Sequence, residues 1–181
     1  MHGQQISIRK DHRTAKRVKI KQIEENLFQL PLERFTWTKS KSNADCVLCS
    51  FQSMKLITPQ QASYYRKKYK YQLLTMGLSA QQTFEILSHK FGDLQWTRTL
   101  ISDVLLNVLL YKLDNNHACF LYLLDEGLLG SHLVIIAKDK YGTVKLLDPQ
   151  MEKVLSNQED ILKYLEDNNF KDDKFFILTH A

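Results

Sequence analysis

Long apolar runs and cysteines are both scarce in this sequence. No apolar run approaches the ~18 residues of a membrane-spanning helix, and the N-terminus is basic and polar, unlike a secretory signal. The three cysteines are too few, and odd in number, for a disulfide framework. These absences predict a soluble protein, and the cysteine count indicates either a reducing compartment or cysteines kept for chemistry. The expected location is the cytosol of its own or of a host cell, with association with a virus particle as an alternative.

Basic charge is concentrated at one end of the chain. The 181 residues are 44% hydrophobic and carry a net charge of +5, which is enough apolar content for one domain with a core. Residues 1–23 have seven basic residues against Asp11, or +6, which leaves −1 for residues 24–181. We therefore expect a basic N-terminal arm over residues 1–23 and a single domain over residues 24–181. The basic residues of the arm are Arg9, Lys10, Arg13, Lys16, Arg17, Lys19 and Lys21.

An arm of this charge can bind nucleic acid, an acidic membrane surface or an acidic protein partner. The alternative is a solvated segment without a ligand. Residues 1–27 contain no Phe, Tyr or Trp, so base stacking by this part of the chain is not expected.

The first half of the chain is predicted to be helical. Apolar residues recur at helical spacing from Asp45 to Ile57, with Asp45 as N-cap and Pro59 after the end. Ser79 and Gly92 bound another helix in the same way. The remaining helical patterns give a long apolar helix and one rich in Tyr and Lys. The predicted ranges after the first helix are 60–72, 79–91 and 97–113.

The second half is predicted to form a sheet. Short apolar runs bounded by turn residues are typical of strands, and one short helix is expected near its end. A helical half followed by an antiparallel sheet is an α+β domain. The predicted strands are residues 118–124, 133–137, 143–147 and 174–178, and the helix is residues 158–166.

Residues 131–150 have the pattern of a β-hairpin that begins at a histidine and ends at an aspartate. Pairing about the Lys140-Tyr141 turn, with i + j near 281, brings Asp148 next to Leu133 and hence beside His132. A histidine and an aspartate in this relation can be an imidazole and the carboxylate that orients it.

A nucleophile for this pair is found upstream, at the start of the first predicted helix. In Asn43-Ala44-Asp45-Cys46-Val47-Leu48-Cys49, Cys46 takes the first helical position, where the amide dipoles stabilise a thiolate. Cys49 lies one turn later and is the alternative nucleophile.

These residue types support acyl transfer through a cysteine. A thiolate at Cys46 attacks an acyl carbon, His132 donates a proton to the departing amine, and Asp148 fixes the tautomer of the ring. Backbone amides at the helix start and the side chain of Asn43 are candidates for the oxyanion hole. No cofactor is required. Taken one at a time, each residue also has an ordinary structural role, as a buried thiol, a strand-start histidine and a turn former before proline.

The same residues resemble the papain-like superfamily, and most closely its papain-fold toxin and glutamine-deamidase branch. Asp45-Cys46-Val47-Leu48-Cys49 resembles the Asn-Cys-x-x-Cys helix start of that branch. Ser131-His132 resembles its histidine strand, and Gly142 to Asp148-Pro149-Gln150 its Gly…Asp-Pro-Gln strand. The similarity extends over residues 43–178 and ends with Phe175-Phe176-Ile177-Leu178. Asp45 departs from the usual asparagine, and no oxyanion glutamine is found upstream.

The resemblance implies a papain-like fold and a Cys46-His132-Asp148 triad in which Cys46, the first cysteine of the pair, is the nucleophile. Its expected activity is that of a peptidase, a glutamine deamidase or a transglutaminase, acting on a peptide bond or a side-chain amide of a protein. The alternative function is a non-catalytic assembly component, for example of a virus particle, whose arm binds acidic partners or nucleic acid.

A zinc site is a further alternative. Cys46 and Cys49 could combine with His117 and Cys119 into a set of four ligands. Cys119, however, lies within an apolar run that is typical of a buried strand, so we expect no metal.

Overall fold

The structure is a computed structural model that describes residues 23, 25–41, 44–99, 109, 111–125, 130–167 and 175–181. Asn43 and the seven basic residues of the predicted arm lie outside the described residues. In chain order the elements are β1 (Leu30–Pro31), η1 (Leu32–Arg34), α2 (Cys46–Ser53), α3 (Pro59–Lys68), α4 (Lys70–Thr75), α5 (Ala80–Ser88), β2 (Leu94–Thr99), β3 (His117–Asp125), β4 (Gly130–Lys138), β5 (Val144–Asp148), β6 (Lys153–Leu155), α7 (Gln158–Asp167) and β7 (Phe175–His180).

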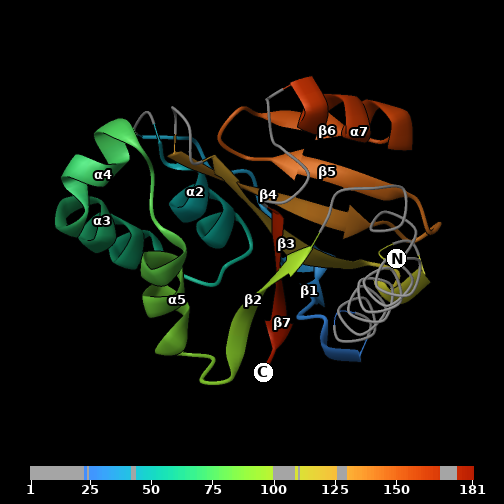
Figure 1. The fold of residues 1–181 in the computed structure, drawn as a ribbon, viewed down its shortest axis with the longest axis horizontal. Helices are drawn as coiled ribbons and strands as arrows, with labels where there is room; N and C mark the ends of the chain where they lie inside the picture. The colour runs from blue at the N-terminus through green and yellow to red at the C-terminus, as the bar shows by residue number, and fades with distance from the viewer. Residues whose placement is uncertain are drawn as a thin grey trace, which may run out of the picture.

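One antiparallel sheet organises the described part of the chain. Its strand order is β2-β7-β3-β4-β5-β6, and β1 pairs with β3. Helices α2 to α5 lie on one side of the sheet and α7 on the other (Figure 1). The expected mixed α+β class is therefore confirmed. Within the described residues, no helix has both the length and the apolar character needed to cross a bilayer.

Strand β4 has a buried core on each face. Leu133, Ile135 and Ala137 pack in the core shared with α2, whereas Val134 and Ile136 pack in the core shared with α7. Successive side chains of a strand point to opposite faces, and a strand covered on both faces reads as a continuous apolar run. This explains why the run after His132 does not alternate with polar residues.

The predicted helix starts are confirmed where capping residues mark them. Ser79 precedes α5 and forms a capping box, in which Gln82 N donates to Ser79 Oγ and Ser79 N donates to Gln82 Oε1. Helix α2 begins at Cys46 and ends at Ser53, shorter than predicted. The helix predicted over residues 60–72 is divided into α3 and α4 at Tyr69, whose ψ of 30° departs from helical geometry.

The long helix predicted over residues 97–113 is wrong at its first end. Residues 94–99 form β2, which pairs with β7 along its whole length. Thr97 and Thr179 are diagonal neighbours across this pair, with hydroxyl oxygens 2.7 Å apart, so cross-strand pairing outweighed the helical pattern. Leu109 is helical and buried in the core on the α7 side, and residues 100–108 lie outside the described residues.

The hairpin of β4 and β5 is shifted by one residue from the predicted pairing. Ile135 pairs with Leu147, so i + j is 282, and continuing this register puts Asp148 opposite Val134. Since residues 132 and 134 share a face, Asp148 and His132 lie on the same side of the sheet. A one-residue slip would have put them on opposite faces.

Replacing the cap of α5 tests how much local chemistry sets the helix start. Ser79→Ala is expected to lower the free energy of unfolding by about 1 kcal/mol, because Gln82 N in the first turn loses its side-chain acceptor. Urea denaturation measures the change. Ser63→Ala, at an exposed position within α3, is the control and should change stability by less than about 0.5 kcal/mol. Equal effects of the two substitutions would contradict the capping role.

Candidate active site

Helix α2 places Cys46 beside the start of β4. The helix packs on this strand, and Ser50 Oγ donates a hydrogen bond to the carbonyl oxygen of Leu133 at 3.4 Å. Before the helix, Ala44 N donates to Leu73 O at 3.0 Å. These contacts hold the segment before the helix and its second turn, and the Cys46 side chain between them is only 1% exposed.

His132 and Asp148 form a direct pair. The distance from His132 Nε2 to Asp148 Oδ2 is 2.7 Å, and Asp148 is fully buried. The same carboxylate accepts hydrogen bonds from the Tyr164 hydroxyl at 2.5 Å and from Met151 N at 3.2 Å. A buried carboxylate with three donors is satisfied in its charged form.

The charges of this pair reinforce each other. Burial lowers the pKa of His132, but hydrogen bonds and attraction from Asp148 and Cys46 outweigh it and raise that pKa to about 10. Burial raises the pKa of Asp148, but the hydrogen bonds and charge of His132, with the Tyr164 and Met151 donors, hold it below the ordinary value. The ring is therefore an imidazolium and the carboxyl group a carboxylate at neutral pH.

Cys46 is the sulfur that acts on His132. The thiol forms a side-chain hydrogen bond with the ring, and its charge also raises the pKa of His132. Because Nε2 is taken by Asp148, Nδ1 is the ring nitrogen left for the sulfur. The structure thus brings together Cys46, His132 and Asp148, the three residues selected from the sequence.

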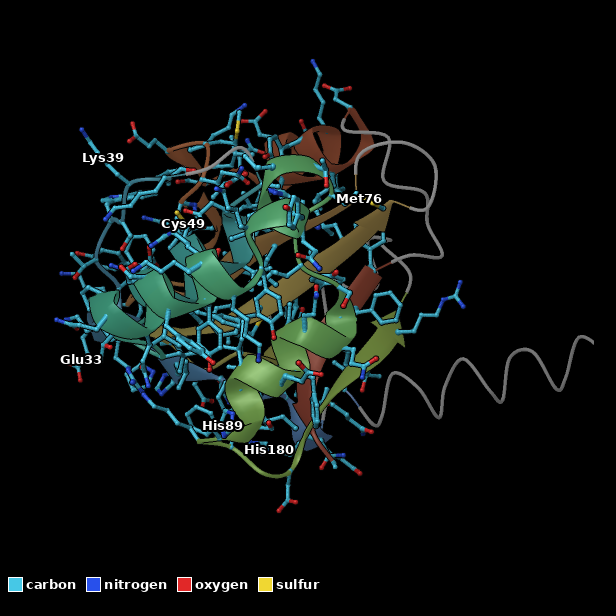
Figure 2. The ribbon with its side chains drawn as sticks, turned by 90° about the vertical axis from the view of Figure 1, so that its left-hand side faces the viewer. Glu33, Lys39, Cys49, Met76, His89 and His180 are labelled. Carbon is cyan, nitrogen blue, oxygen red and sulfur yellow. The ribbon has the colours of Figure 1, made fainter. Side chains whose placement is uncertain are left out.

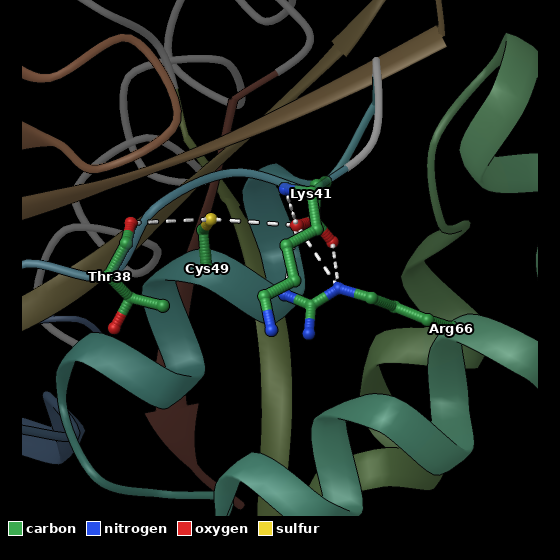
Figure 3. A network of polar contacts seen from close by, with 5 residues as sticks. Thr38, Lys41, Cys49 and Arg66 are labelled. Atoms are coloured by element: carbon green, nitrogen blue, oxygen red, sulfur yellow. Dashed lines mark hydrogen bonds and ion pairs between the residues drawn. The ribbon is translucent and has the colours of Figure 1, made fainter.

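The alternative nucleophile, Cys49, has a different environment. Its sulfur lies 3.7 Å from Thr38 O and 3.7 Å from Asp45 Oδ2 (Figure 3). Burial and the negative charge of Asp45 raise the pKa of this thiol to about 12. Cys49 is therefore protonated at neutral pH and is a poor nucleophile.

Asp45 occupies the predicted N-cap position but makes no side-chain capping bond. Its buried carboxylate instead binds Arg66 of α3, with Nε 3.2 Å from both oxygens and one terminal nitrogen 2.9 Å from Oδ2. Lys41 N donates to the same oxygen at 3.0 Å (Figure 3). The departure from the usual asparagine therefore has a structural partner, which ties the segment before Cys46 to α3.

Tyr164 and Arg66 are the site residues that the sequence did not reveal. Burial and the Asp148 carboxylate raise the pKa of Tyr164, which stays a hydroxyl donor. Its only sequence signal is its place on α7 between Ile161 and Leu165, which pack in the core. Arg66 stands in a run of basic residues, and nothing in the sequence distinguishes it from its neighbours.

The four residues of the zinc alternative have separate environments. Cys119 is buried in the core on the α7 side, where burial raises its pKa to about 12. His117 Nδ1 is 2.9 Å from Asn115 O. Among the residues that the structure describes, no three His, Cys, Asp or Glu side chains are grouped as a metal site.

A pocket of about 760 Å³ opens beside His132. Tyr164 and His132 connect its wall to the Asp148 carboxylate, while Met151 and Leu155 give it apolar surface. Cys46 is not among its lining residues, whereas His132 both lines the pocket and interacts with the Cys46 thiol. The lining residues are His132, Gln150, Met151, Lys153, Leu155, Asp160, Lys163, Tyr164 and Asp167.

Removal of Arg66 tests the buried ion pair beside Cys46. Arg66→Ala is expected to lower the free energy of unfolding by about 3 kcal/mol, because it leaves the buried Asp45 carboxylate without its cation. Chemical denaturation measures the loss, and adding Asp45→Asn should restore part of it. The control is Arg34→Ala, which removes one exposed hydrogen bond to Lys55 O and should have a small effect. A loss no larger than that of the control would contradict the ion-pair role.

Tyr164→Phe tests the support of Asp148. Since the pKa of Asp148 is lowered by folding, its contribution to stability is present above the ordinary pKa and is lost as pH falls through the folded value. Without the Tyr164 donor that pKa rises, so acid unfolding should begin at higher pH, and stability at neutral pH should fall by about 1.5 kcal/mol. Circular dichroism during acid titration measures both. Tyr111→Phe, at an exposed hydroxyl, should leave the acid transition unchanged.

Comparisons with known proteins add no family to this description. Neither the models of protein families nor the curated proteins give a match to the chain. Any chemical assignment therefore depends on the residues and contacts described above.

Proposed function

We propose that this protein is a cysteine-dependent amide hydrolase or acyl transferase of the papain-like kind, with Cys46 as nucleophile. The observation that carries the proposal is the position of His132, whose ring is hydrogen-bonded to the Asp148 carboxylate on one side and to the Cys46 thiol on the other. The residue order along the chain, with cysteine at a helix start and histidine and aspartate on adjacent strands, also supports it.

The reaction begins with attack of the Cys46 thiolate on the carbonyl carbon of an amide. A carbon–sulfur bond forms, and the carbon–nitrogen bond breaks as imidazolium His132 gives its proton to the departing amine. The proposed donors to the oxyanion are the backbone N–H groups at the start of α2, which have no acceptor within the helix. Water then attacks the thioester carbon, His132 accepts a proton from that water, and the carbon–sulfur bond breaks. The acid product is released, and the Cys46 thiolate and the His132 imidazolium are restored.

Asp148 keeps the ring in its productive state during both steps. Its bond to Nε2 leaves Nδ1 to exchange the proton with substrate. Tyr164 and Met151 hold the carboxylate itself in place. These two are positioning residues, because they act on the substrate only through Asp148 and His132.

The pocket beside His132 is the proposed approach for the substrate. It is lined by the histidine that exchanges protons, and its volume suits a side chain or a short peptide segment. Because Cys46 is 1% exposed, the carbonyl carbon reaches the sulfur only when the residues around Cys46 shift. A closed site of this kind limits reaction of the thioester with stray nucleophiles.

The proposal covers peptidase, deamidase and transglutaminase reactions, which share the thioester. A peptidase and a deamidase both resolve it with water and differ in the amide that enters the site. A transglutaminase resolves it with an amine, which then forms the new carbon–nitrogen bond. The substrate in each case is a protein, through a peptide bond or a side-chain amide.

Alkylation of the thiols tests the proposed nucleophile. With iodoacetamide, Cys46 should be modified well below pH ~8.5, where an ordinary cysteine is half ionised. Mass spectrometry should find one modified residue, since Cys49 and Cys119 are protonated there. Cys49→Ser should keep this fast modification and Cys46→Ser should remove it.

Substitutions of the partners sharpen the test. His132→Ala should shift the reaction of Cys46 to higher pH by removing the cation, whereas Asp148→Asn should keep the thiol reactive and impair turnover through the wrong tautomer. If the three thiols instead react together only at about pH 8 to 9, and His132→Ala changes nothing, the cluster is structural and the protein is a binding protein.

A further inference from the structure

Helices α3 and α4 carry a run of aromatic and basic residues that the proposed reaction does not use. Residues 64–71 read Tyr-Tyr-Arg-Lys-Lys-Tyr-Lys-Tyr, and residues 59–84 contain no Asp or Glu. The run is helical because Thr58 and Gln61 form a capping box at its start. Tyr69 N donates to Tyr65 O, and Leu73 N donates to Tyr69 O, so helical hydrogen bonding continues across the break between α3 and α4.

The two helices have an inner and an outer side. Ala62, Tyr69 and Leu73 are buried against the core, and Arg66 is paired with Asp45. The outer side consists of the exposed residues of the two helices. In Figure 2 this side of the molecule faces the viewer. We name it the α3–α4 surface; its residues are Tyr64, Lys67, Lys68, Lys70, Tyr71, Leu74 and Met76.

The lysines of this surface form no ion pair with the described residues. The ion pairs found there do not include Lys67, Lys68 or Lys70, and the Lys68 ammonium lies 5.2 Å from the centre of the Tyr69 ring. Glu85 attracts Lys68 but accepts its hydrogen bond from the Tyr69 hydroxyl, at 3.1 Å. Three lysines beside one acidic residue leave a net positive field, which attracts an anionic partner.

Apolar side chains stand beside these charges. Tyr71 is 83% exposed, Met76 63% and Leu74 53%, and Met76 is at the surface just after α4 (Figure 2). Tyrosine and methionine are enriched at protein interfaces, and large apolar side chains grouped on a surface mark a contact site. The partner must therefore offer apolar groups as well as negative charge.

We propose that the α3–α4 surface docks an acidic polypeptide segment whose carboxylates meet Lys67, Lys68 and Lys70 and whose apolar side chains pack on Tyr71, Leu74 and Met76. A nucleic acid strand would match the lysines and tyrosines but would leave Leu74 and Met76 without apolar contacts. An anionic bilayer would match the charge, yet two aliphatic side chains give little insertion. Charge and apolar area together favour the polypeptide.

The surface is separate from the pocket beside His132. Helices α3 and α4 pack through the core on one face of the sheet, whereas α7, which lines the pocket, packs on the other. Figure 1 shows them at opposite sides of the molecule. A segment docked on the α3–α4 surface leaves the pocket open, and the inference does not depend on the proposed reaction.

Fluorescence anisotropy with the full chain tests the inference. The probe is a labelled peptide of repeated Glu-Glu-Leu-Phe units, and its competitors are polyglutamate, single-stranded oligothymidine and phosphatidylserine vesicles. Lys67→Gln/Lys68→Gln/Lys70→Gln is expected to weaken peptide binding about tenfold at low salt. Tyr71→Ala/Leu74→Ser is expected to weaken it about fivefold and to leave polyglutamate binding nearly unchanged.

Two controls separate this surface from other cations. Lys140→Gln/Tyr141→Ala removes a similar exposed pair on the hairpin turn, where the ammonium is 4.8 Å from the ring centre and Tyr141 is 80% exposed; it should bind like the parent protein. A variant with glutamine at the seven basic positions of the arm should still bind the peptide. In this variant, the substitutions on the α3–α4 surface should weaken binding as they do in the parent protein. The inference is overturned if no peptide binds, or if oligothymidine or vesicles displace the labelled peptide more strongly than unlabelled peptide does. It is also overturned if the arm variant abolishes peptide binding, or if the Lys140/Tyr141 control weakens peptide binding as much as the surface variants do.

Discussion

The buried carboxylate of Asp148 is the constraint on which the candidate site depends. A charge without water is tolerated only where donors replace the lost hydration. Its donors come from three separate places, His132 on β4, Tyr164 on α7 and the backbone of Met151 after β5. The carboxylate therefore holds the hairpin, the following turn and the last described helix in one arrangement. Any packing of α7 that moves Tyr164 also disturbs the histidine ring.

A second buried carboxylate, Asp45, directly precedes Cys46. The two thiols of α2 therefore lie beside different charged groups. Cys49 faces Asp45, whose negative charge opposes ionisation. Cys46 instead interacts with the ring of His132. Both thiols are buried and share one helix, so they differ in the charged group beside each sulfur. The histidine partner is the reason that Cys46 is the proposed nucleophile.

The sequence predicted correctly those helix starts and turns that are determined by residues close together in the chain. Ser79 marks a helix start, and Gly142, with a φ of +82°, accompanies a hairpin turn closed by Asp139. Cys46, His132 and Asp148 were found because each stands at a boundary of a predicted element. In the structure Cys46 begins α2 and Asp148 ends β5, whereas His132 is the third residue of β4. Residues whose role depends on partners distant in the sequence were missed. Arg66 forms an ion pair with Asp45, 21 positions away, and Tyr164 on α7 donates a hydrogen bond to Asp148 at the end of β5. Residues 97–99 of β2 were assigned to a helix because their pairing partners in β7 lie about 80 residues later.

The position of β7 has a consequence for how the chain is made. This strand is the last of the described elements, yet it lies between β2 and β3 and pairs with both. During synthesis from the N-terminus, β3 can pair with β4 early, but β2 has no partner of its own in the sheet until residues 175–180 leave the ribosome. Until then the edges of β2 and β3 present unpaired backbone groups, which favour association with other chains. The chain thus completes its sheet only after translation has passed β7, and a nascent chain that stalls before Phe175 is the species that most needs a chaperone.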